Sequence, residues 1–252
     1  MPDAIAPPVC PRHPDRVSYV NCQRCGRPVC PECQRPAPVG IQCVDCVREA
    51  AEQRGPLLNR LGFVSAGGQP VVTYALIVAN VIAYFVGPLL LGGRPKWIVA
   101  WAIHPGSEWS DWILSGFAHG GYLHIAMNMF VLWQFGTQLE PALGRLRFGI
   151  LYFVSLLGGS LAVVLFHSAA IGASGAIFGL IAGYAVVLLK LKLPAQSLIA
   201  SAGIWLLLGF FIPNISWQGH LGGAVAGAVT MLLMLRGVEK RQARKNARIT
   251  GV

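Results

Sequence analysis

Four polar side chains able to take part in nucleophilic catalysis lie in otherwise apolar stretches of the sequence. They are His124, Asn128, Ser174 and His220. A serine hydroxyl becomes an effective nucleophile when a nearby imidazole accepts its proton. His124 and Asn128 are four residues apart, so on one helix they lie on the same face. Polar groups inside apolar segments are costly and usually functional, and we take these four residues as the candidate site.

A second group of reactive side chains fills the N-terminal region. Seven cysteines and one histidine form four pairs, each with two intervening residues: Cys10 and His13, Cys22 and Cys25, Cys30 and Cys33, Cys43 and Cys46. Eight such ligands are the number that two tetrahedral zinc sites require, whereas disulfides would leave one cysteine over. We therefore predict a module with two structural zinc ions. Thiolate ligands also predict a reducing, cytosolic environment.

Long apolar segments must position the four polar residues. The chain has 252 residues, of which 54% are hydrophobic and 12% charged, whereas soluble domains carry about 25% charged residues. Helices are expected because a lipid-facing backbone must satisfy its own hydrogen bonds. The sequence predicts an all-α, polytopic membrane bundle with six transmembrane helices, preceded by a small cytosolic zinc-binding domain. The six expected spans are Val71–Leu91, Tyr122–Leu139, Leu146–Phe166, Ala173–Leu189, Ala195–Ile212 and Gly219–Leu235.

Charge and composition predict four regions and an orientation. The regions are a zinc-binding module at 1–50, a linker at 51–70, a membrane domain at 71–236 and a basic tail at 237–252. Lysines and arginines follow the second, fourth and sixth spans, so the positive-inside rule places both termini in the cytoplasm. The net charge of +10 resides largely in the head, connections and tail. This distribution suits a lipid bilayer with anionic headgroups, and we expect no nucleic-acid partner.

The same orientation places the four candidate residues toward the outer side of the membrane. Gly175 and Gly179 in the fourth span, like Gly223 and Gly227 in the sixth, are four residues apart. Small residues at this spacing let two helices approach closely. Such an approach is what a hydrogen bond between Ser174 and His220 requires.

Between residues 71 and 236, the motifs resemble those of the rhomboid family of intramembrane serine proteases, and they occur in the family's order. They are His-x3-Asn at His124 and Asn128, Gly-x3-Glu-x3-Gly at Gly136, Glu140 and Gly144, Gly-x-Ser-Gly at Gly172, Ser174 and Gly175, and His-x2-Gly-x3-Gly at His220, Gly223 and Gly227. One departure lies in the first outer connection, where Asp111 and Trp112 stand in the neighbourhood of the family's Trp-Arg pair.

The resemblance implies a role for each motif. Ser174 would be the nucleophile and His220 the general base of a dyad, with no cofactor needed for catalysis. The oxyanion or the substrate would be bound by His124, Asn128 and Gly172. Supporting positions would be His119, Phe178, Gly175, Gly223 and Gly227. The substrates would be transmembrane proteins cut near the outer membrane face. The alternative is a non-catalytic rhomboid-like protein that binds membrane clients, although such relatives lack the Ser/His pair.

The cysteine-rich head resembles B-box and RING-like zinc modules. By that resemblance the pairs interleave, so that one ion is held by Cys10, His13, Cys30 and Cys33 and the other by Cys22, Cys25, Cys43 and Cys46. Sequential pairing remains the alternative. The head could recruit a protein partner, regulate access or only stabilise the N-terminal region. We expect a multi-pass protein of a bacterial plasma membrane.

Overall fold

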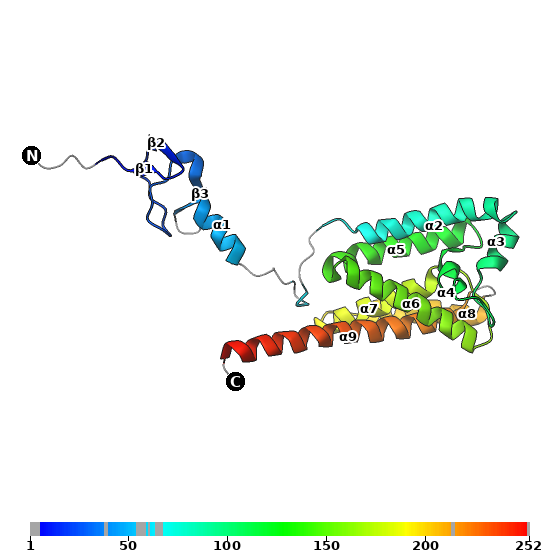
Figure 1. Cartoon of the computed structure of the whole chain (residues 1–252). Coiled ribbons are helices and arrows are strands. Elements are labelled where there is room, and N and C mark those ends of the chain that lie inside the picture. Colours follow the sequence, from blue (N-terminus) through cyan, green and yellow to red (C-terminus); the bar gives the residue numbers. More distant parts are fainter. Residues whose placement is uncertain are drawn as a thin grey trace, which may run out of the picture. The chain divides into compact units, whose positions relative to one another are not determined.

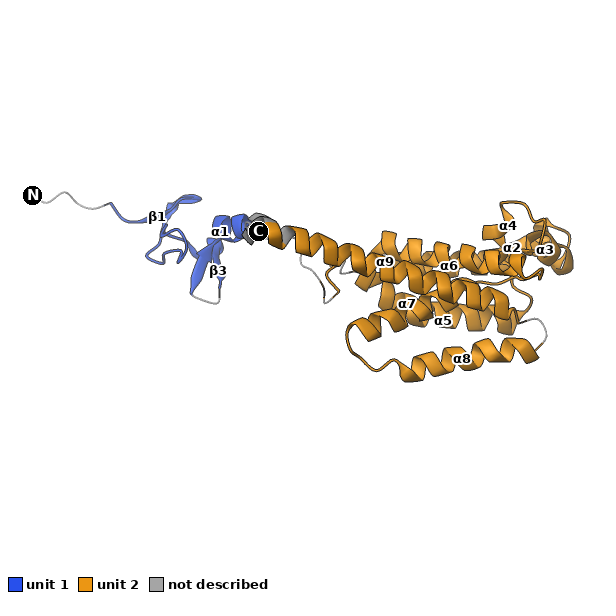
Figure 2. Ribbon diagram, turned by 90° about the horizontal axis from the view of Figure 1, so that it is seen from below, with its two compact units in different colours: residues 1–57 blue, residues 58–252 orange. Residues whose placement is uncertain are grey.

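The computed structural model describes residues 6–37, 40–53, 59, 61–63, 68–212 and 215–250. The chain divides into two compact units, residues 1–57 and 58–252. Figure 1 follows the chain in sequence colours, and Figure 2 colours the two units separately.

The first unit is built from short strands around the cysteines. Strands β1 (Val9–Cys10) and β2 (His13–Val17) pair antiparallel, as do β3 (Gln34–Pro36) and β4 (Ile41–Cys43). The 3-10 helix η1 (Pro31–Cys33) precedes β3, and α1 (Val44–Gln53) follows β4 directly. Six of its buried core residues are cysteines, packed with Val29. So small a hydrophobic core is typical of domains that depend on bound metal for stability.

Ion pairs cover the surface of this unit. Arg12 donates two hydrogen bonds to Asp45 and thereby holds the pKa of that carboxyl below its usual range. Arg16 lies 2.8 Å from Glu32 and lowers the pKa of Glu32 in the same way. These pairs are solvent-exposed, so they add little to stability by themselves.

The second unit consists of helices. In chain order they are α2 (Val71–Leu90), α3 (Arg94–Trp101), α4 (Asp111–Leu114), the 3-10 helix η2 (Ser115–Phe117), α5 (Tyr122–Leu143), α6 (Arg145–Leu165), α7 (Ser174–Lys190), α8 (Gln196–Phe211) and α9 (Trp217–Thr250). Helices α6, α7 and α9 pack most extensively against one another, α2 packs on α5, and α8 contacts α7 and α9 from the side (Figure 2).

Each of the six expected spans corresponds to one long helix, which confirms the predicted all-α fold. Helix α2, helix α6 and residues 217–244 of α9 are long and apolar enough to cross a membrane, and α7 and α8 are shorter apolar helices. Helix α5 has 22 residues and carries both His124 and Asn128. Helix α9 has 34 residues and is about 51 Å long, more than the roughly 30 Å of bilayer hydrocarbon.

Glycines bring α7 and α9 into backbone contact, as their spacing predicted. A Cβ added at Gly223 would overlap the carbonyl of Gly175 and lie 3.0 Å from its Cα, and a Cβ at Gly227 would overlap Gly179. Helix α6 joins this contact through Gly159, whose added Cβ would lie 2.8 Å from the carbonyl oxygen of Gly219. Three helix backbones therefore meet where only glycine fits.

A buried glutamate joins α2 to α5. The Glu140 carboxylate accepts hydrogen bonds from the backbone N–H of Val72 at 2.9 Å, the N–H of Thr73 at 2.7 Å and the Thr73 hydroxyl at 2.8 Å. These N–H groups belong to the first turn of α2, which has no intrahelical acceptor for them. Glu140 therefore caps α2 from a neighbouring helix. At Gly136, one turn earlier on α5, an added Cβ would lie 2.6 Å from the Thr73 hydroxyl oxygen.

Part of the predicted linker packs against the helical unit. The Asn59 side chain donates to the carbonyl of Ala142 at 2.5 Å, and the Phe63 side chain is 1% exposed. The guanidinium of Arg147 lies 4.9 Å from the centre of the Phe63 ring. Residues 54–58, 60 and 64–67 of the predicted linker lie outside the described residues. The division of the chain at 50, 70 and 236 stays a prediction.

Candidate functional site

Ser174 is the first residue of α7 and is partly buried. Gly172, two residues earlier, has φ +113°, a backbone conformation that favours glycine. The Gly172 N–H donates to the carbonyl of Ser115 in η2 at 2.7 Å, which ties the turn before α7 to the outer connection. The first hydrogen bond of α7 runs from Ile177 N–H to Ala173. The N–H groups of residues 174–176 therefore have no partner within the helix.

His220 lies in the first turn of α9, next to the contact between Gly175 and Gly223. Its imidazole stacks on Phe178, with ring centres 4.1 Å apart and planes 10° apart. Phe178 follows Ser174 by four residues, so both side chains lie on one face of α7. The His220 side chain is buried, and Nδ1 has no hydrogen-bond partner within the described part of the chain. The Phe178 ring thus fixes the plane of the His220 imidazole, one helical turn from Ser174 along α7.

His124 lies against the turn that precedes Ser174. A Cβ added at Gly172 would lie 2.7 Å from His124 Nε2, so only glycine leaves room for this ring. His124 Nδ1 accepts a hydrogen bond of 3.4 Å from the Gly120 N–H. The centre of the buried His119 ring is 4.9 Å from that of His124. The two rings meet edge to face.

Asn128 follows His124 by one turn of α5. Its amide nitrogen donates to the His124 carbonyl at 2.8 Å. Its amide oxygen is buried and has no hydrogen-bond partner among the described residues. An unpaired buried polar atom is costly and uncommon in folded proteins.

A pocket opens beside Ser174. It is lined by residues of η2, α6, α7 and the start of α9, among them Ser115, Gly172, Ser174, Gly175, Ser216 and Gly219. Within the described chain, the hydrogen bonds do not include the expected one between Ser174 and His220. The helices approach as expected, but the imidazole plane is set by Phe178 rather than by the hydroxyl. Helix spacing could place the two residues together but could not fix this ring orientation.

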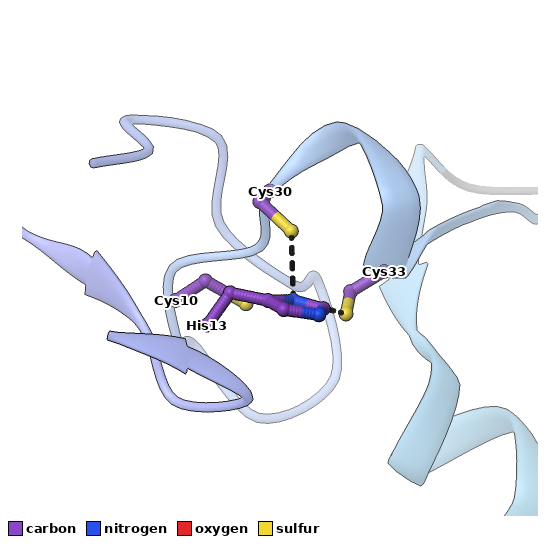
Figure 3. A group of neighbouring side chains, drawn as sticks. All are labelled: Cys10, His13, Cys30 and Cys33. Carbon is purple, nitrogen blue, oxygen red and sulfur yellow. Dashed lines mark hydrogen bonds between the residues drawn. The ribbon is translucent and has the colours of Figure 1, made fainter. Parts of the chain in front are cut away.

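The first metal cluster, defined as Cys10, His13, Cys30 and Cys33, brings two ligand pairs together across the head. Its potential ligand atoms all lie within 4.8 Å of one another. His13 Nδ1 is 3.3 Å from Cys30 Sγ and 3.4 Å from Cys33 Sγ, and Figure 3 shows these ligands converging. Atoms bound tetrahedrally to one zinc ion at 2.0–2.3 Å lie about 3.3–3.8 Å apart. The donor set and its spacing therefore fit a single metal ion.

The second metal cluster, defined as Cys22, Cys25, Cys43 and Cys46, has the same compactness. Cys25 Sγ lies 3.8 Å from Cys43 Sγ. Two backbone N–H groups donate to sulfurs of this cluster, Cys43 N to Cys22 Sγ at 3.2 Å and Cys46 N to Cys43 Sγ at 3.3 Å. The structure thus groups the pairs in the interleaved way that the resemblance implied, and not sequentially.

Several contacts around the site were not predicted from the sequence. The Ser115 carbonyl holds the Gly172 turn, and the Ser160 hydroxyl of α6 donates to the Trp112 carbonyl at 3.0 Å. Asp111, which departs from the family pattern, accepts a hydrogen bond from the Glu108 N–H at 3.1 Å and so stabilises the turn that begins α4. No sequence pattern marks the two serines, because both contacts depend on the tertiary fold.

Comparison with known proteins gives the family. The rhomboid domain model matches residues 106–237. The chain is 31% identical to the rhomboid protease GluP of Bacillus subtilis (strain 168) over 65% of this chain and 35% of that protein. It is 29% identical to the mitochondrial rhomboid protein 1 of Saccharomyces cerevisiae over 52% of this chain and 43% of that one. It is 38% identical to RHOMBOID-like protein 5 of Arabidopsis thaliana over 47% of this chain and 42% of that protein.

Taken together, the apolar helices, the Gly-x-Ser-Gly turn and these matches define a multi-pass membrane protein with a compact helical bundle. The chain belongs to the rhomboid family. It spans less than half the length of each of these three relatives.

Proposed function

We propose that this protein is an intramembrane serine endopeptidase that cleaves transmembrane protein substrates near the outer face of the membrane. The observation that carries the proposal is the meeting of α7 and α9. Glycine contacts bring the two helix backbones together, and the stacked Phe178 and His220 rings lie one turn from Ser174. The names of relatives, including a rhomboid protease and a rhomboid-type serine protease, support the same activity.

In the proposed reaction, Ser174 and His220 act as a dyad. The Ser174 hydroxyl attacks the carbonyl carbon of the scissile peptide, and His220 accepts its proton and then returns it to the leaving amine. Because Nδ1 of His220 is buried without a partner in the described chain, Nε2 is the nitrogen we assign to this proton. Phe178 replaces the orienting carboxylate of a triad by holding the imidazole plane from below.

The negative charge of the tetrahedral intermediate needs donors close to Ser174. We assign this role to the backbone N–H of Ser174 at the start of α7, together with the side chains of His124 and Asn128. His124 lies against Gly172, and the amide of Asn128 is buried one turn further along α5. A single donor of this kind is typically worth about 3–4 kcal/mol of transition-state stabilisation.

The charge distribution and the cysteine clusters support two further proposals, on membrane orientation and on zinc. We propose that both termini are cytoplasmic in a bacterial plasma membrane, because lysines and arginines lie at the start of α6, at the end of α7 and just after it, and along the end of α9. We also assign one structural zinc ion to each metal cluster, because the protein supplies all four ligands of each. Metal analysis of the purified, reduced full chain should find about two zinc ions per chain, and a folded, metal-free head would contradict the assignment.

Cleavage by reconstituted protein tests the proposed activity. Wild type, Ser174→Ala and Ser201→Ala are placed in lipid vesicles with a fluorescent single-span substrate. Ser201 is the matched control, a serine of α8 whose hydroxyl donates a hydrogen bond to the backbone carbonyl of Ser197. We expect wild type and Ser201→Ala to cleave the substrate and Ser174→Ala to leave it intact. Cleavage by Ser174→Ala would contradict the serine mechanism, and substrate binding without cleavage by wild type would favour the client-binding alternative.

A further inference from the structure

The two metal clusters differ in how far their sulfur atoms are protected. All three cysteines of the first cluster are buried, at 1%, 0% and 5% exposure for Cys10, Cys30 and Cys33. In the second cluster three cysteines are equally buried, but Cys25 is exposed. Among the eight ligands, all of which the structure describes, Cys25 alone presents an exposed sulfur-bearing side chain.

The surroundings of Cys25 favour a reactive thiolate. Arg27 Nε donates to Cys25 Sγ at 3.3 Å and places a positive charge beside the exposed sulfur. Exposed cysteines in electropositive settings are the ones that react with oxidants, whereas buried structural cysteines are inert. A second thiolate is close by, since Cys43 Sγ lies 3.8 Å from Cys25 Sγ. Oxidation of Cys25 therefore has a resolving partner within the same cluster.

We propose that Cys25 is a site of oxidation by hydroperoxides, which joins it to Cys43 and releases the ion of the second cluster. In the first step the Cys25 thiolate attacks one peroxide oxygen. An S–O bond forms, the O–O bond breaks, and hydroxide or alkoxide leaves with the electron pair. In the second step the Cys43 thiolate attacks the Cys25 sulfur, an S–S bond forms and hydroxide leaves. Two thiolates are thus oxidised to a disulfide while the peroxide is reduced by two electrons.

The consequence for the metal follows from the ligand count. A disulfide between Cys25 and Cys43 leaves only Cys22 and Cys46 as thiolate ligands, too few for a closed tetrahedral site. The first cluster keeps its ion because its sulfurs are buried and its fourth ligand is a histidine. Cys43 ends β4, and Cys46 lies within the first turn of α1, so the same ion holds the start of that helix. Oxidation should therefore loosen α1 as well.

The inference rests on the proposed zinc occupancy, and the experiment separates the two. Reduced full-length protein in detergent is first analysed for zinc, then treated with hydrogen peroxide in the presence of a chromogenic zinc chelator. We expect one of two ions to be released, and mass spectrometry of the oxidised wild type to find a disulfide between Cys25 and Cys43. A dithiol reductant with added zinc should restore both ions. Protein without zinc before peroxide contradicts the zinc proposal and this inference with it.

Two matched substitutions locate the reactive sulfur. Cys25→His and Cys30→His each replace one thiolate by an imidazole, a ligand that zinc also accepts, in different clusters. We expect Cys25→His to lose the peroxide-dependent release, because its remaining thiolates are buried, and release from Cys30→His to match wild type. Three results for zinc-loaded wild type would contradict the oxidation proposal while leaving the zinc assignment intact. They are retention of both ions, loss of both ions at one rate, and a disulfide that does not include Cys25. The disulfide is mapped in wild type only, so this measurement tests the oxidation proposal even if a variant fails to fold.

Discussion

At the scale of single residues, the candidate dyad depends on an aromatic ring that takes no part in the chemistry. His220 stacks on Phe178 at 4.1 Å, and its Nδ1 has no partner within the described residues. The imidazole is therefore oriented by a flat contact and not by a hydrogen bond.

Phe178 should accordingly act as a positioning residue. We expect Phe178→Leu to lower kcat by about twofold to twelvefold, which corresponds to an aromatic contact worth about 0.5–1.5 kcal/mol, while KM stays close to that of wild type. Phe178→Tyr keeps the ring and should retain most of the activity. Steady-state cleavage kinetics in vesicles measure both constants. Equal losses in the two variants, or a change confined to KM, would show that the stacked ring does not orient His220.

The identities of the polar site residues could be predicted from the sequence, but their contacts could not. Ser174, His124 and His220 stood out because polar side chains are rare in apolar spans. The contact of His124 with Gly172 and the Ser115 carbonyl bond depend on how η2 packs on the bundle. The expected hydrogen bond between Ser174 and His220, which the described residues do not make, could not be judged from the sequence either. Helix periodicity predicts which face a residue lies on, but not its side-chain rotamer.

At the scale of elements, close packing of α6, α7 and α9 sets the site. The spacing of Gly175, Gly179, Gly223 and Gly227 predicted that α7 and α9 approach each other. It did not predict the contribution of α6, whose Gly158 and Gly159 are adjacent rather than four apart. Capping of α2 by Glu140 was also not foreseen, since capping patterns read from a sequence are local and this carboxylate comes from another helix.

The α7–α9 contact gives a prediction about stability. A methyl group at Gly223 would overlap the Gly175 carbonyl and force the helices apart. We expect Gly223→Ala to destabilise the protein by about 1–3 kcal/mol, the usual cost of overpacking, and to lower activity. Gly203→Ala is the control, because the added methyl on α8 meets no side chain or neighbouring element of the described chain within 4 Å. Thermal unfolding in detergent compares them, and similar transition temperatures would argue against close packing at Gly223.

At the scale of the whole molecule, two units with different sources of stability share one chain. The helical unit buries its core between helices, whereas the head has cysteines where a larger domain would have apolar side chains. The cysteine spacing made a metal-dependent head predictable, because four ligand pairs with the same two-residue gap leave few alternatives. The packing of Asn59 and Phe63 onto the helical unit was not predictable, since so short a stretch of mixed apolar and polar residues carries no periodic signal.

The central claim is that Ser174 is a nucleophile activated by His220, and covalent labelling tests it without any choice of substrate. Wild type, Ser174→Ala and His220→Ala in lipid vesicles are treated with a fluorophosphonate, and the modified residue is identified by mass spectrometry. We predict an adduct on Ser174 in wild type, none in Ser174→Ala, and labelling at least about a hundredfold slower in His220→Ala, as expected when a general base is removed. An unlabelled Ser174 in wild type, or an equal rate without His220, would contradict the account.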